Sequence, residues 1–336
     1  MHLGAKSVLV AGAAALAATS FAPPPAQAQD AEPVHIALAD LPEVETLFFL
    51  VGLARAGEQG LDYELTFFAG EELAIQAILA GQADVGLGSP YAVIQRAEVP
   101  VRLFYQVSRI IFFPVVNVEI ASWQDMDGKS MTYHSRGGPL EALAAIVSER
   151  EGITLGTPNY VPGSENRVVA LVQGHIDAAI VDLLNKNMIM EEHPDEFRVL
   201  SWVGPDEVVT DEALFTRLDW LEENEDQAAL LVEELLKASQ ELCENPRTIA
   251  EAREKYNLLP DLPQELADAL ADYYAEAIEA GVYSCDGGTV EAAKNDIAVL
   301  ARAGQLEGSP DELKVEDFWY FEPLQAAKEK LGMTDG

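Results

Sequence analysis

Basic residues are scarce in this chain. Its 336 residues include 21 Lys and Arg against 57 Asp and Glu, a formal net charge of −36 at pH 7. A surface of that sign repels the phosphate backbone of nucleic acids, so the composition excludes nucleic-acid binding. The acidic excess indicates a surface covered with hydrated carboxylates, of the kind that halophilic proteins have, rather than one binding site. A single acidic side chain is therefore weak evidence of function in this sequence.

The sequence also lacks the common catalytic motifs. It contains no HExxH zinc motif, no Cys-x-x-Cys pair, no Gly-x-Ser-x-Gly nucleophile elbow and no complete Gly-x-x-x-x-Gly-Lys-Ser/Thr phosphate loop. Gly86 and Gly88 lack the third glycine of a dinucleotide-binding loop. We therefore expect no enzyme activity, no metal and no cofactor.

Long apolar runs are missing beyond the N-terminal segment. A membrane-spanning helix needs about 20 predominantly apolar residues. The best candidate, residues 99–121, is interrupted by Arg102, Arg109, Pro114 and Glu119. We therefore expect a soluble protein that does not span the membrane.

Residues 1–28 have the pattern of an export signal. Lys6 supplies a positive start, residues 7–22 are apolar or small, and Ala26 and Ala28 form a small-x-small cleavage site. We expect cleavage after Ala28 and a periplasmic protein.

Only two cysteines are present, Cys243 and Cys285, and neither is near the cleavage site, where a lipid anchor would need one. In an oxidising compartment this pair suggests one disulfide, which the chain-entropy model values at roughly 3–4 kcal/mol. Two unpaired buried thiols are the alternative.

The remaining chain alternates strand and helix patterns. β-prone runs at residues 34–39, 63–68 and 83–87 are separated by helical spacing at residues 46–59 and 72–80. Helices of this length between strands require parallel pairing with right-handed crossovers. The pattern predicts an α/β fold with mostly parallel sheets flanked by helices.

The pattern is repeated at a constant offset of 93 residues, which predicts two lobes built to one plan. In both copies a helix ends on a glycine, an Asp turns the chain and an apolar strand follows. The alternative is that the repeat is a coincidence, because many α/β proteins contain a helix, a glycine, an Asp and a strand in this order. The matched residues are Gly70, Gly81 and Asp84 in the first copy and Gly163, Gly174 and Asp177 in the second.

Beyond residue 211 the strand pattern stops. Residues 220–243, 246–256 and 264–280 have helical spacing with acidic outer faces. The aromatic tail at residues 318–321 predicts a segment packed against the protein. We therefore expect added C-terminal helices.

Ligands of parallel α/β sheets bind outside the carboxyl ends of the strands. This rule predicts binding residues on two facing rims, and the offset makes Ser89 and Asp182 equivalent. The acidic candidates would suit a ligand with an amine or a pyrimidine N–H. The aromatic candidates, together with Phe112, would either form an aromatic wall of the binding site or belong to the core. The candidate ligand-binding residues are Asp40, Glu43, Phe68, Gly88, Ser89, Tyr91, Arg109, His134, Ser135, Arg136, Gly137, Gly138, Ser164, Asp182 and Trp202.

The segment at residues 133–140 is the sharpest of these candidates. It combines a strand exit, two glycines and a proline suited to the first helical position. Free backbone N–H groups, the helix dipole and Arg136 favour an anionic head group there. The alternative is a plain turn in which Ser135 caps the helix and Arg136 pairs with an acid elsewhere.

Several stretches carry a family resemblance that covers nearly all of the mature chain. They are ILAGQADVGLGS at residues 78–89, DMDGKSMTY at 125–133 with SRGG at 135–138, VALVQGHIDAAIVD at 169–182 and DWLEEN at 219–224. With these, the chain resembles the periplasmic substrate-binding proteins of ABC importers, in the nitrate/sulfonate/taurine-type group that shares its fold with thiamine-pyrimidine-precursor binders. Arg136 departs from the Ser/Gly-rich turn of that group.

The resemblance implies a two-lobed periplasmic-binding-protein fold of type II. By this analogy the second lobe comprises residues 122–205, and residues 29–121 and 206–336 form the first. The resemblance also implies a monomer that encloses a small ligand by hinge closure and delivers it to a permease with a cytoplasmic ATPase.

The expected ligand is a small organic anion or zwitterion, such as a sulfonate or carboxylate. A neutral or cationic heterocycle like a thiamine pyrimidine, held by aromatics and Asp182, is the alternative. A ligand-sensing partner of a membrane receptor and a thiamine-pyrimidine-synthase-like enzyme are further alternatives. The enzyme family implies a cysteine-rich segment, which this chain lacks.

Overall fold

The structure is a computed structural model. The predicted export signal and its cleavage site lie outside the residues that it describes, as do Asp40, Ser135 and Gly137. The described residues are 32–39, 42–68, 70–97, 100–134, 136, 138–202 and 208–333.

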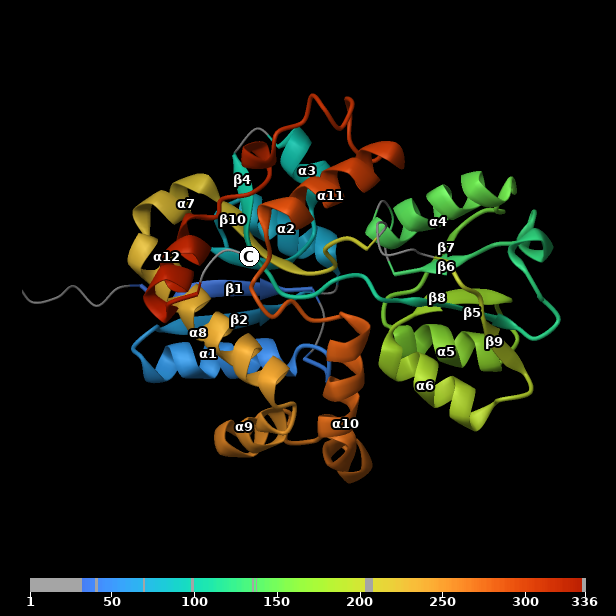
Figure 1. Cartoon of the computed structure of the whole chain (residues 1–336), viewed down its shortest axis with the longest axis horizontal. Coiled ribbons are helices and arrows are strands. Elements are labelled where there is room, and N and C mark those ends of the chain that lie inside the picture. The colour runs from blue at the N-terminus through green and yellow to red at the C-terminus, as the bar shows by residue number, and fades with distance from the viewer. Residues whose placement is uncertain are drawn as a thin grey trace, which may run out of the picture. The chain divides into compact units, whose positions relative to one another are not determined.

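The first sheet has five strands in the order β2-β1-β3-β10-β4. Four of them run in one direction, while β10 is antiparallel to both of its neighbours. We call this sheet and the helices packed on it the first lobe (Figure 1). Its strands are β1 (Val34–Leu38), β2 (Tyr63–Phe67), β3 (Val85–Gly88), β4 (Val101–Gln106) and β10 (Ala213–Arg217), and its first helices are α1 (Leu47–Glu58), α2 (Glu71–Leu79) and α3 (Tyr91–Arg96).

The second sheet repeats this plan in the order β7-β6-β8-β5-β9. Here β5 is the one strand that runs against the others. We call this sheet and its helices the second lobe. It comprises β5 (Phe113–Asn117), β6 (Thr132–Tyr133), β7 (Asn159–Tyr160), β8 (Ala178–Val181), β9 (Phe197–Val199), the 3-10 turn η1 (Trp123–Met126), and helices α4 (Pro139–Glu151), α5 (Ser164–Val172) and α6 (Leu183–Glu192).

The two halves of the sequence repeat occupy corresponding places. Gly81 follows α2 with φ of 67°, and Gly174 follows α5 with φ of 68°. Both angles lie in the left-handed region that favours glycine. Strands β3 and β8, which come next, each lie in the third place of their sheet. The repeat that the sequence suggests is therefore present in the fold.

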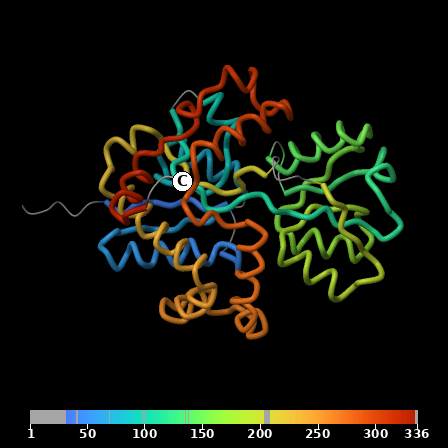
Figure 2. Tube along the Cα trace, viewed as in Figure 1, coloured from blue at the N-terminus to red at the C-terminus, as the bar shows by residue number. Residues whose placement is uncertain are grey.

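The crossing between the lobes lies earlier than the sequence predicted. We expected the second lobe to begin at residue 122, but β5 pairs with β8 and β9 of the second sheet. A strand followed by a short turn gives no sequence signal for the sheet to which it belongs. The chain therefore crosses at residues 107–112, and it returns to β10 through a segment that ends at residue 212. In Figure 2 the second lobe is one continuous stretch of colour, whereas the first combines several.

The predicted C-terminal helices are present and cover the first lobe. Helix α8 packs on α1, and α12 packs on α8 and β4 (Figure 1). The aromatic tail is docked, because Phe318 and Trp319 are buried and Trp319 pairs with Leu103 of β4. The helices are α7 (Leu218–Glu223), α8 (Glu225–Glu244), α9 (Thr248–Tyr256), α10 (Gln264–Ala280), α11 (Val290–Arg302) and α12 (Glu322–Leu331), with a 3-10 turn η3 (Val315–Asp317).

Cys243 and Cys285 form the predicted disulfide, with their Cα atoms 6.0 Å apart. The bond joins the end of α8 to the segment after α10. Residues 33–336 form one compact unit. Within the described part of the chain, no helix has the length and apolar character needed to cross a membrane.

Candidate functional site

A cavity of about 210 Å³ is lined by residues of both lobes and of both crossing segments. The first lobe contributes the segment after β1, the end of β3 and the region around the end of α10. The second lobe contributes the segment between β6 and α4, the start of α5 and the end of β8. Ser108 and Phe112 come from the outgoing crossing segment, and Asp211 and Glu212 from the returning one. The cavity thus lies at the carboxyl ends of parallel strands, as the rule for such sheets predicts.

About half of the predicted binding residues line this cavity. Ser89 and Asp182, the pair related by the repeat, are both among them. The predicted residues in the lining are Glu43, Gly88, Ser89, His134, Gly138, Ser164 and Asp182.

Other predicted residues lie outside the lining. Phe68 is half-buried against the core of the first lobe. Trp202 is buried in the second lobe, where its indole Nε1 donates a hydrogen bond of 2.8 Å to the Phe112 carbonyl. Arg109 donates its backbone N–H to the carbonyl of Val282, and its side-chain Nε is buried without a hydrogen-bond partner among the residues that the structure describes. Aromatic residues beside strands bury a large apolar area, which favours the core over a solvent-filled cavity.

Arg136, which the sequence suggested as an anion ligand, is exposed and lies outside the lining. Its guanidinium carbon lies 5.2 Å from the centroid of the Tyr160 ring, a distance typical of a cation–π contact. The Tyr160 hydroxyl in turn donates to Glu141 at 2.9 Å.

Tyr91 is also a core residue, and it belongs to a buried polar network. Its hydroxyl donates to Asp296 and accepts a hydrogen bond from Trp319. Asp296 also accepts from the backbone N–H and the hydroxyl of Thr210, on the returning crossing segment. The network therefore ties α3 and α11 to the segment that joins the lobes.

Replacing Asp296 with Asn should change how the stability of the protein depends on pH. Burial raises the pKa of Asp296 to about 6, against the hydrogen bonds from Thr210 and Tyr91 that lower it. A carboxyl with a raised pKa holds its proton more tightly in the folded state, so its contribution to the free energy of unfolding falls between about pH 4 and pH 6. As pH rises across this interval, we expect the free energy of unfolding of the wild type, relative to that of Asp296→Asn, to fall by up to about 3 kcal/mol. Urea unfolding at several pH values measures it, and a difference independent of pH would contradict the prediction.

Several lining residues were not among the sequence candidates. Asp211 and Glu212 precede β10, whereas Glu45, near the start of α1, belongs to the segment after the first strand that the strand-end rule predicts to face the site, although it was not singled out there. Because β10 runs against its neighbours, its amino end meets their carboxyl ends. Only the direction of β10 could have identified Asp211 and Glu212. Tyr273 and Tyr283 come from the C-terminal region, which the sequence pattern did not connect to the cavity.

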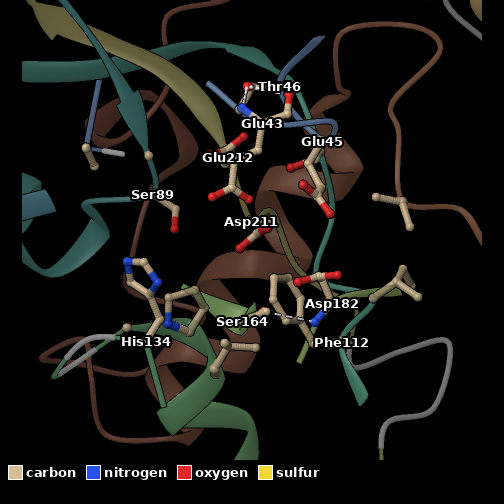
Figure 3. Close-up of a pocket in the computed structure, with 18 of the residues that line it drawn as sticks. Glu43, Glu45, Thr46, Ser89, Phe112, His134, Ser164, Asp182, Asp211 and Glu212 are labelled. Atoms are coloured by element: carbon tan, nitrogen blue, oxygen red, sulfur yellow. Dashed lines mark hydrogen bonds between the residues drawn. The ribbon is translucent and has the colours of Figure 1, made fainter. Parts of the chain in front are cut away.

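The cavity is rich in carboxylates. Burial raises the pKa of Glu45 well above its usual range, and the nearby Asp182 carboxylate raises it further. Burial likewise raises the pKa of Asp211 to about 7, with contributions from Glu71 and Asp182, while Arg167 lowers it. In Figure 3, Glu45 and Asp182 face each other across one side, Asp211 lies near the centre, and His134 and Ser89 lie opposite.

Arg167 holds together the part of the site that the second lobe contributes. It is 1% exposed, and its guanidinium donates 2.7 Å hydrogen bonds to the carbonyls of Ile180 and Val161 and to the Ser164 hydroxyl. Ser164 Oγ also accepts the backbone N–H of Asp182. Asp182 caps α6, and its Oδ1 accepts the backbone N–H of Asn185 at 2.8 Å. These contacts fix the Asp182 carboxylate at the cavity wall.

Comparison with known proteins gives a family match and many similar folds. The family model described as NMT1/THI5 like matches residues 57–249. Among curated protein sequences, none matches significantly. A solved structure from Bordetella bronchiseptica RB50 has a TM-score of 0.72 and 19% identity, over 90% of this chain and 99% of that chain.

Two further solved structures are of named binding proteins. The periplasmic nitrate-binding protein NrtA from Synechocystis PCC 6803 has a TM-score of 0.65 and 14% identity, over 89% of each chain. The putative periplasmic sulfonate-binding protein SsuA from Methylobacillus flagellatus KT has a TM-score of 0.63 and 16% identity, over 90% of this chain and 96% of that chain. These likenesses confirm the predicted two-lobed periplasmic-binding-protein fold. Because its family model covers more than half of the sequence, the chain belongs to the NMT1/THI5-like family.

Proposed function

We propose that this protein is the periplasmic solute-binding component of an ABC importer, and that it binds a small organic solute without altering it. The observation that carries the proposal is the cavity, which is lined by residues of both lobes and of both crossing segments. The ligand expected from the sequence, a small anion or zwitterion, agrees with the sulfonate and nitrate named for the similar structures. The partners would be a membrane permease and its cytoplasmic ATPase.

Binding would act through hinge closure at residues 107–112 and 208–212. A ligand that touches both lobes favours the closed form only by its difference in affinity for the two forms. Direct contacts between the lobes act in the same direction. Asn187 Nδ2 of the second lobe donates to Glu276 of α10 at 2.6 Å, and Gln305 Nε2 of the first lobe donates to the Gly138 carbonyl at 2.8 Å. Helices α4 and α11 also pack together, and Lys186 pairs with Glu276, so ligand contacts would add to contacts that already join the lobes.

A thermal-shift screen of small organic solutes tests the proposal. A ligand at 100 times its dissociation constant adds about 2.7 kcal/mol to the free energy of unfolding. The variant Ser89→Trp places an indole in the cavity wall and should lose this stabilisation. Val169→Trp, at a position on α5 that is 52% exposed and outside the lining, is the matched control and should keep it. Stabilisation that survives Ser89→Trp, or turnover of the solute on long incubation, would contradict the proposal.

A further inference from the structure

We infer that the solute carries a protonated nitrogen group, an amine or an amidine, that Glu45, Asp182 and Asp211 bind in the cavity. This inference rests on the proposed function and specifies its ligand: among the expected solutes it selects a zwitterion or cation over a simple anion. The first ground is the charge of the wall, because a carboxylate wall repels an anion and attracts an ammonium or amidinium group. The carboxylate residues of the lining are Glu43, Glu45, Glu71, Asp182, Asp211 and Glu212.

The second ground is the state of the one arginine in the described lining. Arg167 is buried, and its Nε, Nη1 and Nη2 atoms all donate to protein oxygens. No lysine is among the described lining residues. By sequence, the short internal segments outside the described residues contain no Lys or Arg either. An anionic solute would therefore find little positive charge in this wall.

The third ground is a buried polar atom that lacks a partner. Glu45 Oε1 belongs to a lining residue, is buried, and has no hydrogen-bond partner in the described part of the chain. A buried acceptor left unsatisfied costs about 1–3 kcal/mol, more when it is charged. A nitrogen group carries several N–H donors, which can satisfy Glu45 and bond Asp182 and Asp211 at the same time.

The rest of the lining fits an organic body attached to that group. The rings of Phe112, Tyr273 and Tyr283 supply aromatic surface beside the carboxylates. Aromatic faces attract cations and also bury apolar carbon. Ser89 and His134 lie opposite the carboxylates in Figure 3, where they can bond a polar tail.

The protonation of the lining carboxyls predicts that binding of a cation depends on pH, which can be measured separately from affinity. Asp211, whose pKa is about 7, faces Glu71, Asp182 and Arg167, while Glu45 faces Asp182 and Glu43 and has a strongly raised pKa. The empty site therefore holds protons near neutral pH. A bound cation favours the ionised carboxylates, so binding releases protons and strengthens as pH rises through 7.

The test uses two probe sets in the thermal-shift screen. One holds amines, amidines and amino-sulfonates, and the other holds alkanesulfonates and carboxylates of matched size without nitrogen. We expect stabilisation by members of the first set only. Stabilisation by nitrogen-free anions alone would overturn the inference and leave the proposed function standing, whereas stabilisation by neither set would overturn both. Stabilisation by Mg²⁺ or Ca²⁺ alone would also overturn the inference, because the occupant would then be a metal ion.

Isosteric variants then locate the group that binds. Glu45→Gln and Asp211→Asn should each weaken binding of a stabilising amine by about tenfold or more, without lowering the melting temperature of the free protein. Glu279→Gln, at an exposed position of α10 outside the lining, is the matched control and should have no effect. Calorimetry at pH 7 in phosphate and in Tris should report proton release that Asp211→Asn reduces. Unchanged or tighter binding in both lining variants would overturn the inference.

Discussion

Replacing Arg167 with methionine should lower the free energy of unfolding by about 3–5 kcal/mol, because three acceptors would lose their donor and an unsatisfied buried acceptor costs about 1–3 kcal/mol. Methionine can fill the space of the aliphatic stem but donates no hydrogen bond. The carbonyls of Ile180 and Val161 and the hydroxyl of Ser164 would each lose a donor at 2.7 Å, in a buried place for Ile180 and Ser164 and a part-buried one for Val161. Lysine should not rescue the loss, because one ammonium cannot reproduce the planar fork of donors.

Urea unfolding of the variant measures this loss. Arg96→Met is the matched control, because Arg96 is 62% exposed on its side chain and lies 3.8 Å from Glu307. Exposed pairs of this kind contribute about 0–1 kcal/mol. Ligand binding should weaken as well, since Arg167 holds Ser164, which in turn holds the backbone of Asp182. A loss at Arg167 no larger than that at Arg96 would show that the network does not stabilise the second lobe.

Removing the disulfide is the second large expected effect. The double variant Cys243→Ser, Cys285→Ser should lose about 4 kcal/mol, the chain-entropy value for a bond that closes a sequence separation of 42 residues. The closed loop contains α9 and α10, and α10 contributes Tyr273 to the cavity. We therefore expect weaker ligand binding together with the lower stability.

A reducing agent provides the control for this prediction. Wild-type protein in dithiothreitol should unfold at the same urea concentration as the double variant, and the reducing agent should not affect the variant itself. If the oxidised wild type and the double variant differ by less than about 1 kcal/mol, the bond does not constrain the unfolded chain as the entropy model requires.

The main elements of both sheets could be predicted from local patterns. Gly81 and Gly174 mark helix ends in the sequence and adopt left-handed φ angles of 67° and 68° in the structure. Residues 264–280 were predicted as a helix, and they form α10 with the same bounds. Such features depend on residues close in sequence, because hydrophobic period and glycine content act within one element.

Which residues line the cavity was harder to predict from the sequence than the main elements of the two sheets. Tyr91 and Trp202 are beside strands, as the sequence suggested, but their rings fill the core, where the Tyr91 hydroxyl bonds Asp296 and the Trp202 Nε1 bonds the Phe112 carbonyl. Arg136 follows β6, yet it lies over Tyr160 outside the cavity. Loop position alone fixes which rim a residue belongs to, whereas packing of the whole lobe fixes where its side chain points.

The sequence by itself determined the repeated strand and helix pattern and with it the two-lobed plan, because these follow from hydrophobic periodicity. It suggested the pairing of Cys243 and Cys285 but left unpaired thiols open, and the structure joins the two residues. Only the tertiary structure decided that the wall of the cavity is acidic. Glu45, Asp182 and Asp211 are far apart along the chain. Glu45 and Asp182 follow strands of different sheets, and Asp211 lies near them because the antiparallel strand β10 brings its amino end to the carboxyl ends of its neighbours. No local pattern encodes that meeting, since it depends on which strands pair and in which direction.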